Sequence, residues 1–281
     1  MENLTFNFST NDGLTLLGRI WQTPSPKPKG VVNLVHGLGE HSGRYADVAK
    51  MMNQAGYHFA GFDLRGHGLS EGKRGHSPGF DYLLDDVSIF LDQSRLIIGD
   101  PCPQFLYGHS LGGCIVINYG LRRSPTLAGV IATAPPLRLS FAPPKIKLSF
   151  GKIMSALFPS LVMRNELEQE ALSRDKAIVK AYQDDVLVHD RISARLAIDL
   201  IEGGQYGLDH AGDWGLPLLL MHGTGDRISA SDASEEFAQK AGEKVFLELW
   251  EDYYHEIHND LGKEKVLQKM IDWLDVQTRQ V

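Results

Sequence analysis

The stretch that decides the fold is QFLYGHSLGGCIVINYGL, residues 104–121. Gln104 to Tyr107 form a short, largely apolar run typical of a buried strand, and residues 111–121 predict a helix. Between them lies the Gly-x-Ser-x-Gly pentapeptide 108–112, at a strand-to-helix turn. Its glycines let the backbone turn sharply, so we expect the Ser110 hydroxyl to stand exposed beside the unpaired N–H groups of a helix start. Ser110 is therefore the expected nucleophile.

Two further pentapeptides match the same pattern without this context. Residues 68–72 (GLSEG) are followed by Lys-Arg-Gly, which does not open an apolar helix, and residues 75–79 (GHSPG) follow no strand. Glycine and serine usage alone gives such a match a chance of roughly one in ten in a chain of this length. We therefore expect Ser70 and Ser77 to lie in loops. A structural serine in a tight turn is the alternative for Ser110.

Predicted strands alternate with predicted helices along the chain, which is the pattern of an α/β protein with a mostly parallel sheet flanked by helices. Residues 4–9 and 14–22 flank a Thr-Asn-Asp-Gly turn and predict an antiparallel hairpin at the sheet edge. Further strands are predicted from apolar runs at residues 31–35, 57–62, 128–134, 216–221 and 245–250. Helices are predicted at residues 45–55, 80–98, 231–241 and 266–276.

The alternation breaks at residues 135–213, which contain no clear strand and are mostly amphipathic helix. We expect a core of residues 1–134 and 214–281 with a helical cap, residues 135–213, inserted as a lid. One apolar face of the cap carries Phe150, Met154, Leu157 and Phe158, and we expect these side chains to bind substrate. A second face is formed by Ala194, Leu196, Ala197, Leu200 and Ile201. Simple packing on the core is the alternative for both faces.

A serine nucleophile needs a base and an orienting acid, and loops after buried strands are the places to look for them. Asp226 follows the strand ending at Met221, and His255 follows the strand of residues 245–250. Asp232 and His258 are the alternatives. The chain order serine, acid, histidine is that of the α/β-hydrolase fold.

The ester carbonyl oxygen also needs two N–H donors as negative charge develops on it. One is expected from Leu111, directly after the nucleophile. The other is expected from Leu38, in the glycine-rich loop that follows the strand of residues 31–35. His36 in the same loop is interpreted as a structural residue, with a role as base the alternative.

Composition is that of a globular enzyme. The chain has 281 residues, 43% of them hydrophobic and 22% charged, and a net charge of −7 that disfavours a nucleic-acid partner. It has no apolar run of membrane-spanning length and no signal-peptide pattern at its start. Cys102 and Cys114 form neither a disulfide framework nor a zinc pattern. We expect a cytoplasmic location and no metal ion.

Five segments together resemble the monoacylglycerol lipase and lysophospholipase group of α/β-hydrolases, a serine aminopeptidase-like family: HGLGEHSGRY (36–45), FDLRGHGLSEG (62–72), GHSLGG (108–113), HGTGDRIS (222–229) and YYHEIHND (253–260). The resemblance extends from about residue 31 to 276 and is weak across the cap. It implies a triad of Ser110, Asp226 and His255, with an oxyanion hole from the N–H groups of Leu38 and Leu111. It also implies a glycerol ester with a single acyl chain as substrate, and no metal or cofactor. The expected serine mechanism passes through an acyl-enzyme intermediate, and we expect medium-to-long acyl chains.

Other functions remain open from the residues alone. An aminopeptidase of this fold needs acidic cap groups for the substrate ammonium, and the candidates are Glu166, Glu168, Glu170, Asp184 and Asp185. A dehalogenase requires aspartate in place of Ser110 and is excluded. A non-catalytic ligand-binding protein usually lacks a triad member, and this chain keeps all three. We also expect a transient contact between the cap and a lipid surface, and leave the oligomeric state open.

Overall fold

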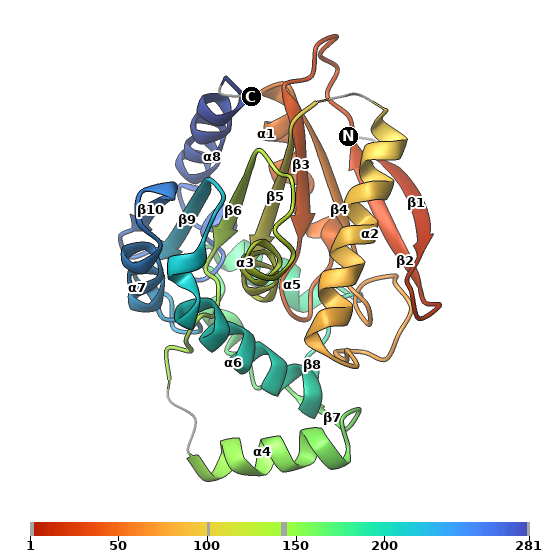
Figure 1. Ribbon diagram of the computed structural model, residues 1–281, viewed down its shortest axis with the longest axis vertical. Helices are drawn as coiled ribbons and strands as arrows, with labels where there is room; N and C mark the ends of the chain where they lie inside the picture. Colours follow the sequence, from red (N-terminus) through yellow and green to blue (C-terminus); the bar gives the residue numbers. More distant parts are fainter. Residues whose placement is uncertain (1–2, 100–101, 142–144, 280–281) are drawn as a thin grey trace.

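The computed structural model describes residues 3–99, 102–141 and 145–279. These residues form an eight-stranded sheet in the order β1-β2-β4-β3-β5-β6-β9-β10 (Figure 1). Strand β2 runs antiparallel to its neighbours β1 and β4, and the other neighbours in the sheet are parallel. The strands are β1 (Leu4–Ser9), β2 (Thr15–Trp21), β3 (Gly30–Val35), β4 (Tyr57–Phe62), β5 (Gln104–His109), β6 (Gly129–Thr133), β9 (Leu218–Gly223) and β10 (Val245–Trp250).

This arrangement confirms the mostly parallel sheet predicted from the sequence, including the N-terminal hairpin. Strands β1 and β2 pair antiparallel at the sheet edge, with Leu4 opposite Ile20 and Ser9 opposite Thr15. Every residue of β3, β4 and β5 is buried, because helices cover both faces of the sheet. That burial explains why these strands are almost continuous apolar runs in the sequence.

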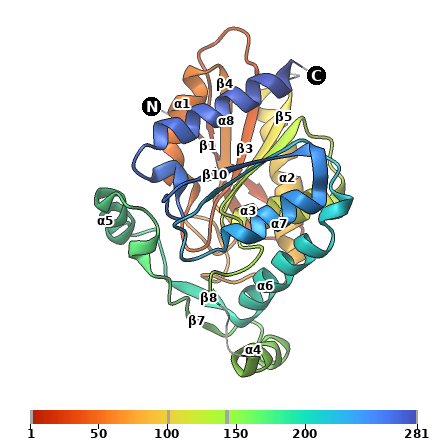
Figure 2. The same ribbon diagram turned by 90° about the vertical axis from the view of Figure 1, so that its left-hand side faces the viewer.

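Helices divide between the two faces of the sheet (Figures 1 and 2). On one face, α1 (Ala46–Gln54) and α8 (Lys263–Thr278) pack against strand residues such as Val32 and Phe105. On the other face, apolar side chains pack from α2 (Phe80–Ile98), α3 (Leu111–Arg123), α6 (Ala194–Asp209) and α7 (Ser231–Ala241). Short 3₁₀ turns occur at Ser42–Tyr45, Gln169–Ala171, Ala211–Asp213, Gly242–Lys244 and Ile257–Asn259.

The chain between β6 and β9, here called the β6–β9 segment (residues 135–213), contains α4 (Lys145–Leu157), α5 (Lys176–Asp184) and α6. It also contains two short strands that the sequence did not predict, β7 (Val162–Arg164) and β8 (Arg191–Ser193), paired antiparallel. Three residues are too few to show a period of two. Helix α4 lies at the foot of Figure 1, away from the sheet. Within the described ranges, no helix combines the length and apolar character that a membrane span requires.

The β6–β9 segment is bonded through its main chain to core loops that follow strands of the sheet. Three of these loops contain Gly39, Ala230 and Glu256, and each forms a main-chain hydrogen bond with a different part of the segment. Main-chain bonds of this kind do not depend on side-chain rotamers, so they fix the segment against the core. The three bonds run from Ala230 N–H to Arg138 O (2.9 Å), from Glu256 N–H to Leu172 O (2.7 Å) and from His189 N–H to Gly39 O (2.9 Å).

Candidate active site

The turn between β5 and α3 places Ser110 in an unusual backbone conformation. Its φ is 53° and its ψ is −120°, a left-handed region that costs energy for any residue except glycine. The flanking glycines are required by close backbone approach. A Cβ atom on Gly108 would lie 2.3 Å from Gly112 O, and one on Gly112 would lie 1.9 Å from Val35 O. The GHSLGG sequence therefore folds into a tight elbow that projects the serine hydroxyl from the sheet.

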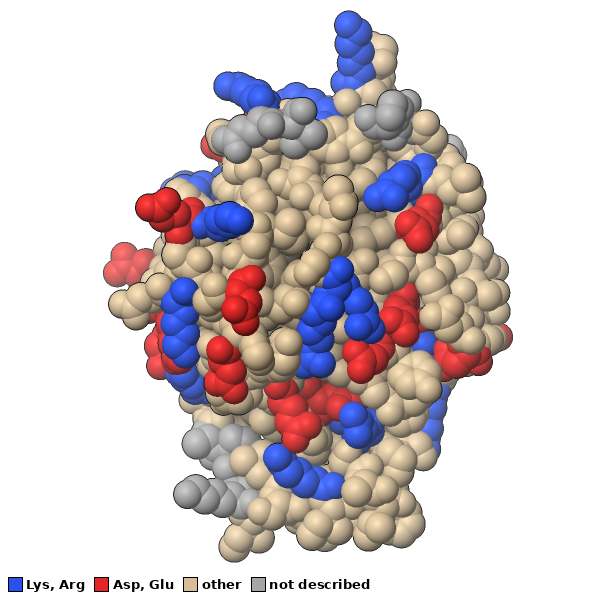
Figure 3. All heavy atoms as spheres, in the orientation of Figure 1, with Lys and Arg blue, Asp and Glu red and all other residues tan. Residues whose placement is uncertain are grey.

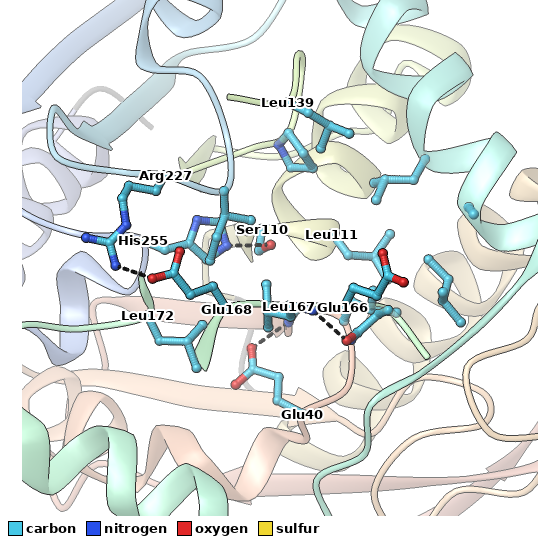
Figure 4. Close-up of a pocket in the computed structure, with 18 of the residues that line it drawn as sticks. Glu40, Ser110, Leu111, Leu139, Glu166, Leu167, Glu168, Leu172, Arg227 and His255 are labelled. Carbon is cyan, nitrogen blue, oxygen red and sulfur yellow. Dashed lines mark hydrogen bonds and ion pairs between the residues drawn. The ribbon is translucent and has the colours of Figure 1, made fainter. Parts of the chain in front are cut away.

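Three side chains from separate loops meet at this elbow. The Ser110 Oγ lies 2.8 Å from His255 Nε2 (Figure 4). On the other side of the ring, His255 Nδ1 lies 2.7 Å from Asp226 Oδ2. The other carboxylate oxygen of Asp226 accepts the N–H groups of Ile228 (2.7 Å) and Ser229 (3.1 Å). This is the geometry that a nucleophile, a base and an orienting acid require.

The electrostatics of the group favour a charged acid beside a basic imidazole. Burial opposes ionisation of Asp226, but the charge and hydrogen bond of His255, together with a hydrogen bond from His222, hold the pKa of the carboxyl well below its usual range. Burial also opposes a charged His255, and here the Asp226 carboxylate outweighs it and raises the pKa of the imidazole above its ordinary value. The imidazole is thereby a stronger proton acceptor than a free histidine.

The two other Gly-x-Ser-x-Gly serines are bonded to backbone. Ser70 Oγ donates to Asp63 O at 2.5 Å, and Ser77 Oγ donates to Gly79 O at 2.8 Å. Neither serine is within hydrogen-bond reach of His255. Their loop placement agrees with the sequence interpretation.

The alternative base and acid lie outside the hydrogen-bonded group. His258 is buried, and its ring stacks on Tyr45 with centroids 4.9 Å apart; neither of its nitrogens has a hydrogen-bond partner in the described structure. Burial lowers its pKa to about 4. Asp232 is exposed and pairs with Arg138 at 3.3 Å. His36 accepts the Leu64 N–H at Nε2 (2.9 Å), which is a structural contact.

The loop after β3 brings Leu38 beside the nucleophile, and both Leu38 and Leu111 line the cavity at Ser110. Leu111 opens helix α3, where first-turn N–H groups have no acceptor within the helix. The loop is fixed from behind by Glu40, whose Oε1 accepts the Gly37 N–H at 2.6 Å and the Tyr45 hydroxyl at 2.8 Å.

A buried charged network that the sequence analysis missed supports this loop. Arg44 binds Glu256 through two hydrogen bonds of 2.8 and 2.9 Å and also binds Glu40. Its guanidinium carbon lies 4.7 Å from the centre of the Tyr182 ring. Burial opposes the charge on Glu256, but Arg44 outweighs it and lowers the pKa of Glu256 to about 2. The only sequence signal was the set of charged residues within the two motif loops.

Ser110 lies in a cavity of about 600 Å³ between the core and the β6–β9 segment. Its polar part includes Glu40, Tyr182 and Glu256, and Glu168 and Arg227 also line it, joined at 2.9 Å (Figure 4). Within the described residues, no cluster of three or more His, Cys, Asp or Glu is placed to hold a metal ion. Most residues that line the cavity are apolar: Leu38, Leu111, Pro136, Leu139, Phe141, Met163, Leu167, Leu172, Ile192, Ala197, Leu200, Ile201 and Ile228.

The structure does not bring the four expected cap residues to this cavity. Phe150, Leu157 and Phe158 are 61%, 66% and 58% exposed, and neither they nor Met154 are among the lining residues. The cavity wall comes instead from the second apolar face, on α6. Periodicity identifies which residues share a helix face but not what the face contacts, so the sequence could not show that the face of α6, and not that of residues 150–158, lines the cavity.

The acidic residues considered for binding an ammonium group are mostly engaged elsewhere. Asp184 pairs with Lys180 at 2.7 Å, and Asp185 lies 2.9 Å from His41 Nε2. Glu170 is exposed and is not a lining residue. Glu166 and Glu168 line the cavity, where Glu168 is paired with Arg227 as described above.

Comparison with known proteins gives consistent matches. The model of the family described as "Serine aminopeptidase, S33" matches residues 26–262. An uncharacterised abhydrolase domain-containing protein of Dictyostelium discoideum is 36% identical over 277 residues; the match covers 98% of this chain but only 29% of that protein. A monoacylglycerol lipase of Mycolicibacterium smegmatis is 33% identical over 276 residues, 95% of each chain.

Among solved structures, the crystal structure of a monoacylglycerol lipase from Paleococcus ferrophilus superposes with a TM-score of 0.82 at 32% identity, covering 99% of this chain and 100% of that one. The covered part of the chain includes both the sheet and the β6–β9 segment. The chain therefore belongs to the serine aminopeptidase S33 family of α/β-hydrolases, as the resemblance of its motifs predicted.

Proposed function

We propose that this protein is a serine ester hydrolase that cleaves glycerol esters with a single medium-to-long acyl chain. The observation that carries the proposal is the hydrogen-bonded series Ser110, His255 and Asp226 inside a mainly apolar cavity of about 600 Å³. Monoacylglycerol lipases that match along almost the whole chain support the choice of substrate.

The reaction proceeds in two steps. His255 Nε2 takes the Ser110 proton, and Ser110 Oγ attacks the ester carbonyl to form a tetrahedral intermediate. The N–H groups of Leu38 and Leu111 donate to its oxyanion. His255 then protonates the departing alcohol oxygen, which leaves an acyl-enzyme. Water, deprotonated by His255, releases the fatty acid and restores Ser110, while Asp226 holds the imidazole and stabilises its charged form.

The lining of the cavity suits the two ends of such a substrate. Apolar side chains from α6 and from residues 136–141 offer a surface to an acyl chain, and each buried methylene contributes about 0.8 kcal/mol. Close to Ser110, the carboxylates of Glu40 and Glu256 and the Tyr182 ring give a polar end suited to a small alcohol. The pairing of Glu168 with Arg227 disfavours the aminopeptidase alternative, because that carboxylate is already neutralised.

We further propose that residues 135–213 act as a cap whose helix α4 contacts a lipid surface. Ile146, Phe150, Ile153 and Leu157 form an exposed apolar stripe at helical spacing, with exposures from 56% to 85%. Phe141 is 60% exposed and Met163 is 44% exposed, and both also line the cavity. In Figure 3 the lowest part of the molecule, apart from the grey atoms, is mostly tan, which marks residues other than Lys, Arg, Asp and Glu. An acyl chain could thus pass from lipid to Ser110 along apolar side chains.

The two free cysteines are consistent with a cytoplasmic location.

The test is a panel of substrates assayed with wild type and three variants. Monoacylglycerols of increasing chain length should be hydrolysed faster than acetate esters and far faster than amino-acid anilides. Ser110→Ala, Asp226→Asn and His255→Ala should each lower kcat by about 10³- to 10⁶-fold without loss of fold. Ser77→Ala is the control and should keep wild-type turnover. Preferential cleavage of the anilides would contradict the proposed substrate, and a fully active Ser110→Ala would contradict the proposed mechanism.

A further inference from the structure

A second histidine touches the acid of the proposed triad. His222 lies on β9, and its side chain is fully buried. Its Nε2 is 3.2 Å from Asp226 Oδ2 and 3.2 Å from Ser229 O, and its Nδ1 is 2.7 Å from the Ser234 hydroxyl on α7. The imidazole therefore joins a core helix to the carboxylate oxygen that also faces His255.

The partners of the ring determine where its proton lies. Both a carboxylate oxygen and a carbonyl oxygen face Nε2, and each can only accept a hydrogen bond. Nε2 therefore carries a proton, and Nδ1 forms a hydrogen bond with the Ser234 hydroxyl. In this arrangement the Nε2–H of His222 donates to Asp226. The Ser229 hydroxyl, 2.7 Å from the same oxygen, is also 3.1 Å from Ala134 O and has another acceptor available.

We propose that His222 is a positioning residue of the reaction, which holds the Asp226 carboxylate in the orientation that serves His255 and limits the negative charge that His255 experiences. The inference rests on the proposed function, because it assigns Asp226 as the triad acid. A carboxylate oxygen shared among several donors, here His255, His222 and Ser229, attracts the His255 proton less strongly than one with fewer donors. Without His222 the carboxylate is freer to turn, and His255 holds its proton to higher pH.

Several other groups influence the charge of His255, and these residues are the same in the wild type and in a His222 variant. Glu256 and Glu40 favour the charged imidazole. The rings of His109 and His258 lie close by, and the His109 and His255 centroids are 5.0 Å apart. Arg44 is bound to both of the carboxylates named here. None of these groups is hydrogen-bonded to His222, so we expect a change in the pH profile to report on the contact with Asp226.

The experiment compares His222→Leu with His222→Gln in the full chain. The measurements are kcat and KM for a short p-nitrophenyl ester, and the rate of labelling by a fluorophosphonate, both from pH 5 to pH 9. His222→Leu should lower kcat/KM about 10- to 100-fold, mainly through kcat, because a hydrogen bond to a charged group is lost. The acidic limb of the plot of kcat/KM against pH should move to higher pH by roughly half to one pH unit. His222→Gln should return the limb toward wild type, because its amide can donate to Asp226.

The matched control is His67→Leu. His67 is equally buried and binds Arg65 O through Nδ1, but it does not contact the triad. This control should have a lower melting temperature than wild type, but the acidic limb of its pH profile should stay at the wild-type pH. If His222→Leu keeps the wild-type limb, whatever its rate or melting temperature, its role is structural and the proposal is overturned.

Two further outcomes are decided by the same experiment. If His222→Leu does not fold, Ser234→Ala replaces it, because it frees Nδ1 while keeping the imidazole; a smaller shift in the same direction supports the proposal, and no shift overturns it. Labelling requires the triad but no particular alcohol. A wild type that labels but ignores monoacylglycerols therefore refutes the proposed substrate alone, whereas a wild type that never labels refutes both proposals.

Discussion

Replacing Arg44 with methionine tests the buried charged network directly. The Arg44 side chain is 9% exposed, and those of Glu40 and Glu256 are 3% and 2% exposed. Methionine keeps much of the length and packing of arginine but removes its charge. Both carboxylates then lose their shared partner in a site that water scarcely reaches. One of them, Glu40, also accepts the Gly37 N–H that fixes the loop of Leu38.

The expected loss of stability is large. Removing one member of a buried ion pair costs about 3 to 5 kcal/mol, because an uncompensated charge stays buried. That corresponds to a fall in melting temperature of roughly 6 to 20 °C for a large domain. The loss should depend on pH. The folded-state pKa of Glu256 is depressed to about 2, so its contribution is complete above its unfolded pKa and disappears as pH falls toward 2. The wild-type advantage over Arg44→Met should therefore narrow below about pH 5.

Urea unfolding followed by circular dichroism at pH 7.5 and pH 4.5 measures both effects. Lys180→Met is the control, since Lys180 and Asp184 form an exposed pair worth less than about 1 kcal/mol. The double variant Arg44→Met with Glu256→Gln should recover part of the loss. A cost for Arg44→Met no larger than that of the control, or a cost that is equal at the two pH values, would refute the reasoning.

Three further predictions concern the elbow, the cavity and the base. Gly112→Ala should abolish activity and markedly lower the melting temperature, because its Cβ would lie 1.9 Å from Val35 O; wild-type activity would contradict the close approach. Ile201→Asp should reduce hydrolysis of long acyl esters far more than that of acetate esters, whereas Leu157→Asp should spare soluble esters and weaken binding to lipid vesicles in a sedimentation assay. An equal effect of Ile201→Asp on all chain lengths would place the acyl chain elsewhere. Finally, kcat/KM should fall on acidification with an apparent pKa above the ordinary histidine value, since the pKa of His255 is raised; His255 serves as a base only when neutral.

The sheet could be predicted from sequence because its strands are short apolar runs bounded by turn residues. Strands β4 and β10 and helices α2 and α7 begin and end where the pattern predicted. The meeting of Ser110, Asp226 and His255 could be anticipated because parallel strands place the loops after them at one edge of the sheet. His258 lies only three residues after His255 and was the alternative base. In the structure its ring stacks on Tyr45 and forms no hydrogen bond with Ser110.

The cavity wall, the Arg44 network and the contact of His222 depend on tertiary contacts, which leave no periodic pattern in the sequence. Helices α4 and α6 are both amphipathic, and only the structure decides that α6 faces the cavity while α4 is exposed. Arg44 and Glu256 are 212 positions apart in the sequence, so their pairing is invisible without the fold. His222 was overlooked for a different reason. It opens the HGTGDRIS motif directly after the predicted strand, and only the fold shows that its side chain turns back to Asp226, four residues further on.

The main-chain bonds between the β6–β9 segment and the loops of Gly39, Ala230 and Glu256 set limits on chimeric enzymes. A graft that exchanges all of residues 135–213 with those of a relative also exchanges Arg138, Leu172 and His189, and each must find the same partner again. A graft of α4 alone leaves those bonds intact. It replaces the exposed stripe and, among the side chains that the structure describes, needs to preserve the ion pair of Lys152 with Glu202 on α6, at 3.0 Å. The preferred lipid surface can therefore be redesigned separately from the chemistry at Ser110, provided that the junctions lie within a few residues of the ends of α4.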